Sequence, residues 1–239
     1  MLSSPSNLLK QAWEIYKKRF WVFLPIMIIP LFAPSILASI LFPFRIKTGH
    51  FEAESLNALS IGLLVVVGVL ILVSVFIHLW SQIALLYAIK DREEGVEIKE
   101  YYRRGWNKMT SFFWVYLLSN FIIAGGSVLF FVPGLIFLIW FIFAPFVLIM
   151  ENKKGAESLW ASKEYVKGHW FAVFWKFLIF GILAWLVLWA VSVITGITGI
   201  GDTGKINLYA SYILLNPIGV IYLFLIYENL KKIKKSNID

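Results

Sequence analysis

Three polar side chains recur at a four-residue spacing inside an otherwise apolar run. Ser74, His78 and Gln82 would share one face of a helix at this spacing. A face of this kind could carry a proton or a small solute through lipid. Burying a histidine in the bilayer costs free energy, so a histidine at such a position often has a function. The alternative is structural: a neutral histidine that hydrogen-bonds a neighbouring helix and stabilises packing. From spacing alone, packing is the favoured interpretation.

Two asparagines in other apolar runs raise the same question. Asn120 lies in the third run, and Asn216 lies in the last one directly before Pro217. With Gly219, these residues predict a kink with a freed backbone carbonyl, a feature that lines binding sites in transporters. Proline is also common in membrane helices for packing reasons, and packing is again the favoured interpretation. The candidate polar track consists of Ser74, His78, Gln82, Asn120 and Asn216.

The residues that catalysis usually needs are missing. No acidic residue lies in the middle of an apolar run, cysteine is absent and there are three histidines. Ion-coupled transport and intramembrane proteolysis usually require a buried carboxylate or a nucleophile with a base. The phosphate-loop, zinc-peptidase and serine-hydrolase motifs are not found either. We therefore predict no catalytic residue, no metal site and no cofactor, and we expect that the protein is not an enzyme.

The composition predicts an all-α integral membrane protein. Hydrophobic residues make up 60% of the 239 residues and charged residues 15%, which is more apolar surface than a soluble core of this size can bury. Eleven tryptophans fit a protein with much surface at the level of the lipid headgroups. The first apolar run follows a polar lead and lacks a small-residue cleavage pattern, so we expect no cleavable signal peptide.

Six apolar runs are long enough to cross about 30 Å of hydrocarbon, which takes roughly 17 to 25 residues. They cover residues 21–43, 58–89, 111–131, 133–150, 170–195 and 207–227. No charge separates the third run from the fourth, and Gly125, Gly126, Pro133 and Gly134 indicate a tight hairpin between them. The alternative is a single bent segment over residues 111–150, which would move the C-terminus to the other side of the membrane.

The basic residues indicate the orientation. Most of them lie around residues 10–19, 90–108, 153–167 and 231–235, whereas the opposite set of connections holds Arg45, Lys47 and Lys205. The positive-inside rule then places both termini in the cytoplasm of a multipass protein of the cell (inner) membrane. The net charge of +8 is therefore interpreted as a topological signal and an attraction to anionic lipid, not as a nucleic-acid site. Lys176 is expected to extend its amine to the cytoplasmic surface.

Three short charged segments precede the three pairs of apolar runs. Residues 6–20, 96–109 and 155–168 place apolar residues at helical spacing opposite charged ones. We predict that they form amphipathic elbow helices in the cytoplasmic interface. An elbow followed by two spans, repeated three times, accounts for residues 1–239 as a single membrane domain. The candidate contacts with lipid headgroups are Lys17, Lys18, Arg103, Arg104, Lys163 and Lys167. The alternative is that these charged residues only form the water-exposed face of each helix.

Two stretches resemble a known family. The first is "LLKQAWEIYKKRFW" near the N-terminus, and the second is "PGLIFLIWFIFAPFVLIMENKKGAESLWASKEYVKGHWFAVF", residues 133–174. They resemble the bacterial six-span proteins grouped with the membrane domain of glycerophosphoryl diester phosphodiesterase. The resemblance implies a six-helix membrane domain. In fused relatives the phosphodiesterase activity belongs to a separate soluble domain; no connection here is long enough to hold one, so we do not transfer that activity. The positions that carry the motif are Pro133, Gly134, Ala144, Pro145, Glu151, Glu157, Leu159, Ser162 and Gly168.

Two functional hypotheses follow. The favoured one is a non-enzymatic membrane module whose elbow helices bind the cytoplasmic leaflet, lipid headgroups or a partner membrane protein. The alternative is a small-solute transporter or permease, which Pro25, Pro30 and Pro34 of the first run and the face of His78 support. A polar-lined cavity that reaches the middle of the membrane would favour transport, and a tightly packed apolar interior would not.

Overall fold

The computed structural model describes residues 3–47, 58–199 and 203–236. Within these ranges every regular element is helical. The connections at residues 48–57 and 200–202, which we predict on the external side, lie outside the described residues. The elements are α1 (Pro5–Lys18), α2 (Phe20–Lys47), α3 (Ala58–Lys90), α4 (Ile98–Leu129), α5 (Phe131–Phe141), α6 (Ala144–Glu151), α7 (Ala156–Val166), α8 (Trp170–Thr198), α9 (Thr203–Ala210), the π-helical turn η2 (Ser211–Leu215) and α10 (Asn216–Ser236).

The helices confirm a multipass membrane protein. Among the described residues, five helical segments are long and apolar enough to cross a membrane: Leu64–Lys90, Ile98–Val128, Phe131–Glu151, Trp170–Thr198 and Gly204–Ser236. The described apolar part of the first predicted span is shorter, Phe20–Phe32. The total of six spans therefore remains a prediction.

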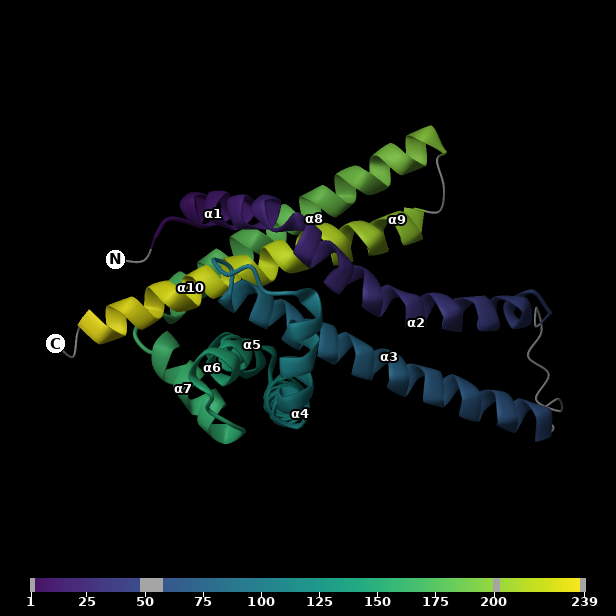
Figure 1. Ribbon diagram of the computed structural model, residues 1–239, viewed down its shortest axis with the longest axis horizontal. Coiled ribbons are helices and arrows are strands. Elements are labelled where there is room, and N and C mark those ends of the chain that lie inside the picture. The colour runs from purple at the N-terminus through teal and green to yellow at the C-terminus, as the bar shows by residue number, and fades with distance from the viewer. Residues whose placement is uncertain (1–2, 48–57, 200–202, 237–239) are drawn as a thin grey trace.

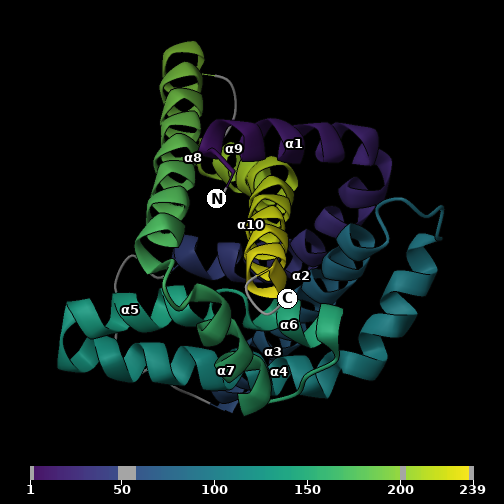
Figure 2. The ribbon, with the colours of Figure 1, turned by 90° about the vertical axis from the view of Figure 1, so that its left-hand side faces the viewer.

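The long helices form three pairs that diverge from a common region. In Figure 1, α2 and α3 extend to the lower right, α8 and α9 extend to the upper right, and α4 is seen almost end on. Figure 2, turned by 90°, shows α4 and α5 running side by side across the view. The apolar core lies where the pairs meet and includes Phe23, Ile83, Val147 and Tyr222, all of them fully buried.

The third and fourth apolar runs form two helices that pack against each other, not one bent segment. Phe130 has extended backbone angles between α4 and α5. Two glycines allow the close approach: a Cβ on Gly126 would lie 2.6 Å from Phe137, and a Cβ on Gly134 would lie 2.0 Å from Ser127. These contacts explain the glycine at position 134, because any larger residue there would push the two helices apart.

The elbow predicted at residues 96–109 is not a separate helix. The helix α4 runs without interruption from Ile98 to Leu129, so elbow and span are continuous. Figure 2 shows that α4 nevertheless changes direction strongly along its length. The physical reason for the continuity is that residues 106–112 contain neither proline nor glycine to end the helix.

The fourth predicted span, residues 133–150, is divided into α5 and α6. Pro145 lies in the first turn of α6 and has no N–H to donate to the preceding turn. Ser162 of α7 occupies the break: its hydroxyl donates to the carbonyl of Trp140 at 2.6 Å and accepts from the N–H of Phe143 at 3.2 Å. The third elbow therefore packs against the protein, and its serine pairs with two backbone groups at the break between α5 and α6.

The first elbow also packs against the protein. Leu8, Ala12 and Tyr16 of α1 are buried. Ser3 donates to the side chain of Asn229 at 2.9 Å, so α1 lies against α10. One side of this amphipathic helix thus faces protein, although the sequence predicts only a helix lying in the interface.

Candidate functional site

Two adjoining cavities bring the whole candidate polar track together. A cavity of about 440 Å³ is lined by Ser74, His78 and Asn120, and one of about 540 Å³ is lined by His78, Gln82 and Asn216. Parts of α2, α3, α4 and η2 surround the first, and parts of α3, α4, α6, α8, η2 and α10 surround the second. We call the two cavities together the chamber.

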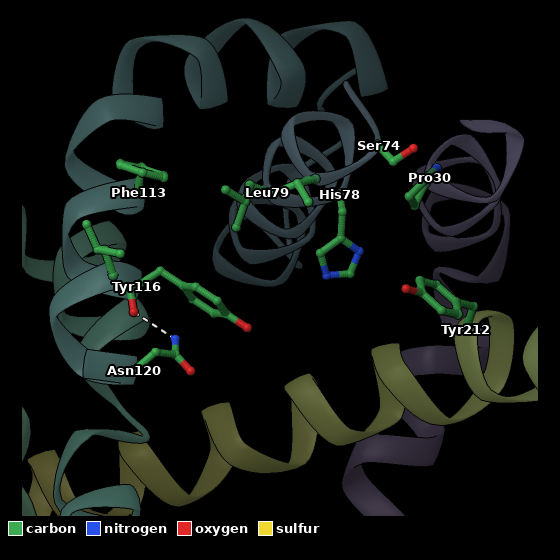
Figure 3. Close-up of a pocket in the computed structure, with 10 residues that line it drawn as sticks. Pro30, Ser74, His78, Leu79, Phe113, Tyr116, Asn120 and Tyr212 are labelled. Carbon is green, nitrogen blue, oxygen red and sulfur yellow. Dashed lines mark hydrogen bonds between the residues drawn. The ribbon is translucent and has the colours of Figure 1, made fainter. Parts of the chain in front are cut away.

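Two tyrosines that the sequence interpretation missed complete the chamber. Tyr116 and Tyr212, like His78, line both cavities. Figure 3 shows the imidazole of His78 between the two tyrosine rings, with the Tyr212 hydroxyl directed toward it. The rings of His78 and Tyr212 meet edge to face, with centroids 5.9 Å apart. The sequence contains a pattern that could have identified them: each tyrosine precedes a candidate asparagine by four residues and so shares its helix face.

The hydrogen bonds divide the chamber residues into two groups. Ser74 donates to the carbonyl of Leu70 and Asn120 donates to the carbonyl of Tyr116, both at 2.7 Å, so these side chains bond their own helices. The Nδ1 atom of His78 is buried without a partner. Among the described residues, His78 forms no hydrogen bond to a neighbouring helix. The packing interpretation that the sequence favours involves such a bond, and the described residues do not supply one.

Three further chamber groups are also available to a ligand. Within the part of the chain that the structure describes, the hydroxyls of Tyr116 and Tyr212 and the amide of Gln82 form no hydrogen bond with the protein. No described residue with a formal charge lines either cavity. The chamber is therefore a mostly apolar space with several neutral donors and acceptors.

The chamber lies deep along its helices. His78 precedes Lys90, the last residue of α3, by about 18 Å of helix axis at 1.5 Å per residue. Half the hydrocarbon thickness of a bilayer is about 15 Å. A helix that ends at the membrane surface near Lys90 therefore places His78 near the middle of the bilayer.

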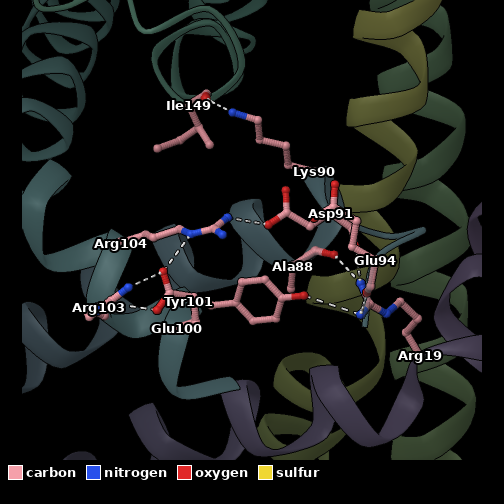
Figure 4. A network of polar contacts seen from close by, with 10 residues as sticks. All are labelled: Arg19, Ala88, Lys90, Asp91, Glu94, Glu100, Tyr101, Arg103, Arg104 and Ile149. Atoms are coloured by element: carbon pink, nitrogen blue, oxygen red, sulfur yellow. Dashed lines mark hydrogen bonds and ion pairs between the residues drawn. The ribbon is translucent and has the colours of Figure 1, made fainter. Parts of the chain in front are cut away.

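A polar network connects the ends of α2, α3 and α4 (Figure 4). Arg19 donates to the carbonyls of Ala88, Asp91 and Glu94 at 3.1, 2.7 and 2.6 Å. Ala88 lies in the last turn of α3, where carbonyls have no partner within the helix, and Asp91 and Glu94 lie in the turn that follows. Arg19 therefore closes the end of α3 and holds the junction between α1 and α2 against it.

Two of the candidate headgroup contacts belong to this network. Arg104 pairs with Asp91 at 2.7 Å and with Glu100 at 3.0 Å, and Arg103 pairs with Glu100 at 2.8 Å. Their charges are thus partly compensated inside the protein. The main role of Arg104 is structural, because its loss would leave the carboxylate of the largely buried Asp91 without a positively charged partner.

The other candidate headgroup contacts are more available. The amine of Lys17 lies 5.7 Å from the ring centre of Trp13, and that of Lys163 lies 4.3 Å from Trp140 and 5.0 Å from Trp160. The remaining two are exposed residues: Lys18, which lies 3.9 Å from Glu93, and Lys167.

A second polar cluster surrounds Glu151 where α6 ends. Tyr165 and Tyr227 each donate to its carboxylate at 2.6 Å, and Lys231 pairs with it at 3.2 Å. Burial and the hydrogen bond to Glu151 raise the pKa of Tyr165 above its usual value. The acidic position of the family motif therefore connects α6, α7 and α10, which is a structural task.

Lys176 corrects one expectation. The sequence predicts that its amine extends to the cytoplasmic surface, but the residue is only 7% exposed. The reason is that α10 covers this part of α8, where the hydroxyl of Tyr222 donates to the carbonyl of Lys176 at 3.1 Å.

Searches with the chain against protein-family models, curated proteins and solved structures found no match. The described residues also contain no group of three or more histidine, aspartate or glutamate side chains that could hold a metal ion. The resemblance to the six-span family stays a prediction, and the candidate site is defined by its geometry alone.

Proposed function

We propose that this chain is a non-enzymatic module of the cell membrane, with six spans and both termini in the cytoplasm, that holds the cytoplasmic leaflet through its three elbow segments. The single observation that carries the proposal is that each elbow exposes one tryptophan. Trp13 of α1 is 43% exposed, Trp106 near the start of α4 is 58% exposed and Trp160 of α7 is 63% exposed. Indole rings favour the headgroup level of a bilayer.

The two faces of the elbows support this role. Buried residues of α1 and α7 pack on the protein, as Tyr16 and Ser162 do. The tryptophans and neighbouring lysines remain on the outside, with Lys17 beside Trp13 and Lys163 beside Trp160. An elbow of this kind is fixed to the bundle on one side and can bind lipid with the other, and each basic residue near an anionic surface contributes about 1 kcal/mol.

The same arrangement supports membership of the six-span family. The motif residues that the structure describes have structural tasks: Gly134 allows the α4–α5 contact, Ser162 satisfies the break before Pro145, and Glu151 connects three helices. A family defined by such positions would share an architecture and not a reaction. This inference is in line with a module that binds lipid or a partner membrane protein.

Retention of anionic lipid tests the proposal. We would purify the protein in a mild detergent from vesicles that contain phosphatidylglycerol and measure the bound lipid by native mass spectrometry. Lys17→Gln combined with Lys167→Gln should lower retention several-fold, because both lysines are exposed and neither pairs with a carboxylate among the described residues. The matched control is Lys232→Gln with Lys235→Gln, which removes the same charge from exposed positions outside the elbows. Equal retention by the two double variants would argue against the elbows as the lipid-binding segments.

One observation favours a second candidate, a small-solute transporter or permease. The chamber at His78 contains unpaired polar groups at a depth near the middle of the bilayer. Glycerol entry into proteoliposomes, followed by light scattering, tests this candidate. A rate above that of protein-free vesicles, lost in His78→Phe with the fold intact, would support it. A rate equal to the protein-free vesicles would count against it.

A further inference from the structure

The first cavity of the chamber opens toward the side of the bundle. Its lining includes residues of α3 and α4 that also form the outer surface: Val75, Phe113, Tyr116 and Leu117 are 42–50% exposed. In a membrane this surface faces lipid hydrocarbon. A molecule dissolved in the bilayer can therefore reach this cavity from the lipid side without passing through water.

The chamber offers hydrogen bonds at a depth where water is scarce. Figure 3 shows the imidazole of His78 in the same space as the hydroxyls of Tyr116 and Tyr212. Unpaired polar groups in an apolar medium carry a free-energy cost, which a ligand with its own donors or acceptors would remove. The Nδ1 atom of His78, buried and without a partner, is the clearest case.

The lining also restricts the charge of the ligand. No described residue that lines either cavity is charged. A phosphate or ammonium group at this depth would have no counter-charge, and such groups are expensive inside a bilayer. A headgroup with hydroxyl, ester or other carbonyl oxygens suits the donors without that cost.

The shape of the chamber accommodates a chain next to the polar groups. The two cavities continue on either side of His78 and are lined by apolar residues, among them Leu79 and Leu117 in the first and Leu188 and Leu223 in the second. Each volume is in the range of small-molecule sites. We propose that the chamber binds a neutral lipid, with its hydroxyl or carbonyl head at His78, Tyr116 and Tyr212 and its hydrocarbon along the apolar walls. This site is distinct from the elbows that hold the leaflet.

Photolabelling with a defined neutral lipid tests the site. The probe is a dioctanoylglycerol that carries a diazirine in one chain, irradiated in proteoliposomes of the full chain, and labelled peptides are identified by mass spectrometry. We expect label on α3 and α4 around Leu79, Phe113 and Leu117. Excess dioctanoylglycerol should compete, whereas dioctanoyl phosphatidic acid, with the same chains and a charged head, should not. Label spread evenly over all spans, or equal competition by both lipids, would overturn the proposal.

Single variants test the polar contacts. Tyr212→Phe and Tyr116→Phe each remove one hydroxyl, and each should reduce specific labelling about five-fold, as expected for one hydrogen bond. Tyr209→Phe is the matched control, because this tyrosine lies one turn away on α9, is exposed and does not line the chamber. His78→Phe should abolish specific labelling. Wild-type labelling in both tyrosine variants would overturn the proposal, even if the histidine variant failed to fold.

Discussion

The hydroxyl of Tyr16 donates a hydrogen bond to the carbonyl of Ile213 at 3.0 Å. Ile213 lies in the π-helical turn η2, four residues before Pro217, which has no N–H to donate to that carbonyl. Directly before Asn216 and Pro217 the helix is thus π-helical, and the carbonyl that Pro217 leaves free has a partner. The partner comes from α1, so an irregularity in the last helical segment is stabilised by the first helix of the chain.

Tyr16→Phe should therefore destabilise the protein. The change leaves the carbonyl of Ile213 without the donor that Tyr16 provides, and we expect a loss of about 1 kcal/mol in the free energy of unfolding. Denaturant titration in detergent micelles measures this loss. Tyr209→Phe, which removes an exposed hydroxyl, should have little effect. Equal stabilities of the two variants would mean that the hydrogen bond between α1 and η2 contributes nothing.

Ser162→Ala should destabilise the break between α5 and α6. The serine hydroxyl serves both the carbonyl of Trp140 and the N–H of Phe143, and the N–H belongs to a fully buried residue. Leaving these groups unpaired should cost about 1–3 kcal/mol. The matched control is Ser119→Ala, because this buried serine bonds only the carbonyl of Val115 in its own helix. In micelles, Ser162→Ala should unfold at a clearly lower temperature than Ser119→Ala. The reverse order of the two unfolding temperatures would refute the role assigned to Ser162.

The hydrogen bond of Tyr165 to Glu151 predicts a pH dependence. A pKa of Tyr165 that is raised in the folded state means that its contribution to stability is complete below the unfolded pKa of about 10 and is lost as the pH rises through the folded value. The stability difference between the wild type and Tyr165→Phe should be constant from about pH 7 to 9 and should shrink above about pH 10. Unfolding titrations at each pH provide the measurement. A difference that grows with pH would contradict the assigned hydrogen bond.

The helices could largely be predicted from the sequence, because apolar run length and helix-breaking residues are local properties. The predicted runs 58–89 and 170–195 correspond closely to α3 (Ala58–Lys90) and α8 (Trp170–Thr198). The sequence predicts a boundary between elbow and span near residue 110, where the composition changes from polar to apolar. The helix α4 continues through this position, because such a change does not end a helix. The division after Phe141 is not predicted by run length, because the apolar composition continues through it; Pro145 in the first turn of α6 is its only local signal.

The candidate site shows the same limit. Helical spacing predicts that Ser74, His78 and Gln82 share one face, and each of the three lines the chamber. Tyr116 and Tyr212 come from other helices, and which helices meet is decided by tertiary packing that periodicity does not encode. The ion pair of Arg104 with Asp91 likewise depends on the turn between α3 and α4, which periodicity does not place. The pair of Arg104 with Glu100 lies within α4 at a spacing of four residues.

Cysteine labelling tests the central claim, that the ends of α3 and α6 share the cytoplasmic side of the membrane with both termini. The chain contains no native cysteine, so single cysteines can be introduced as Thr48→Cys, Glu94→Cys, Lys154→Cys and Asp202→Cys. We predict that a membrane-impermeant maleimide labels positions 48 and 202 from outside intact cells and labels positions 94 and 154 only after the cell membrane is permeabilised. Labelling of positions 48 and 94 from the same side would contradict the account.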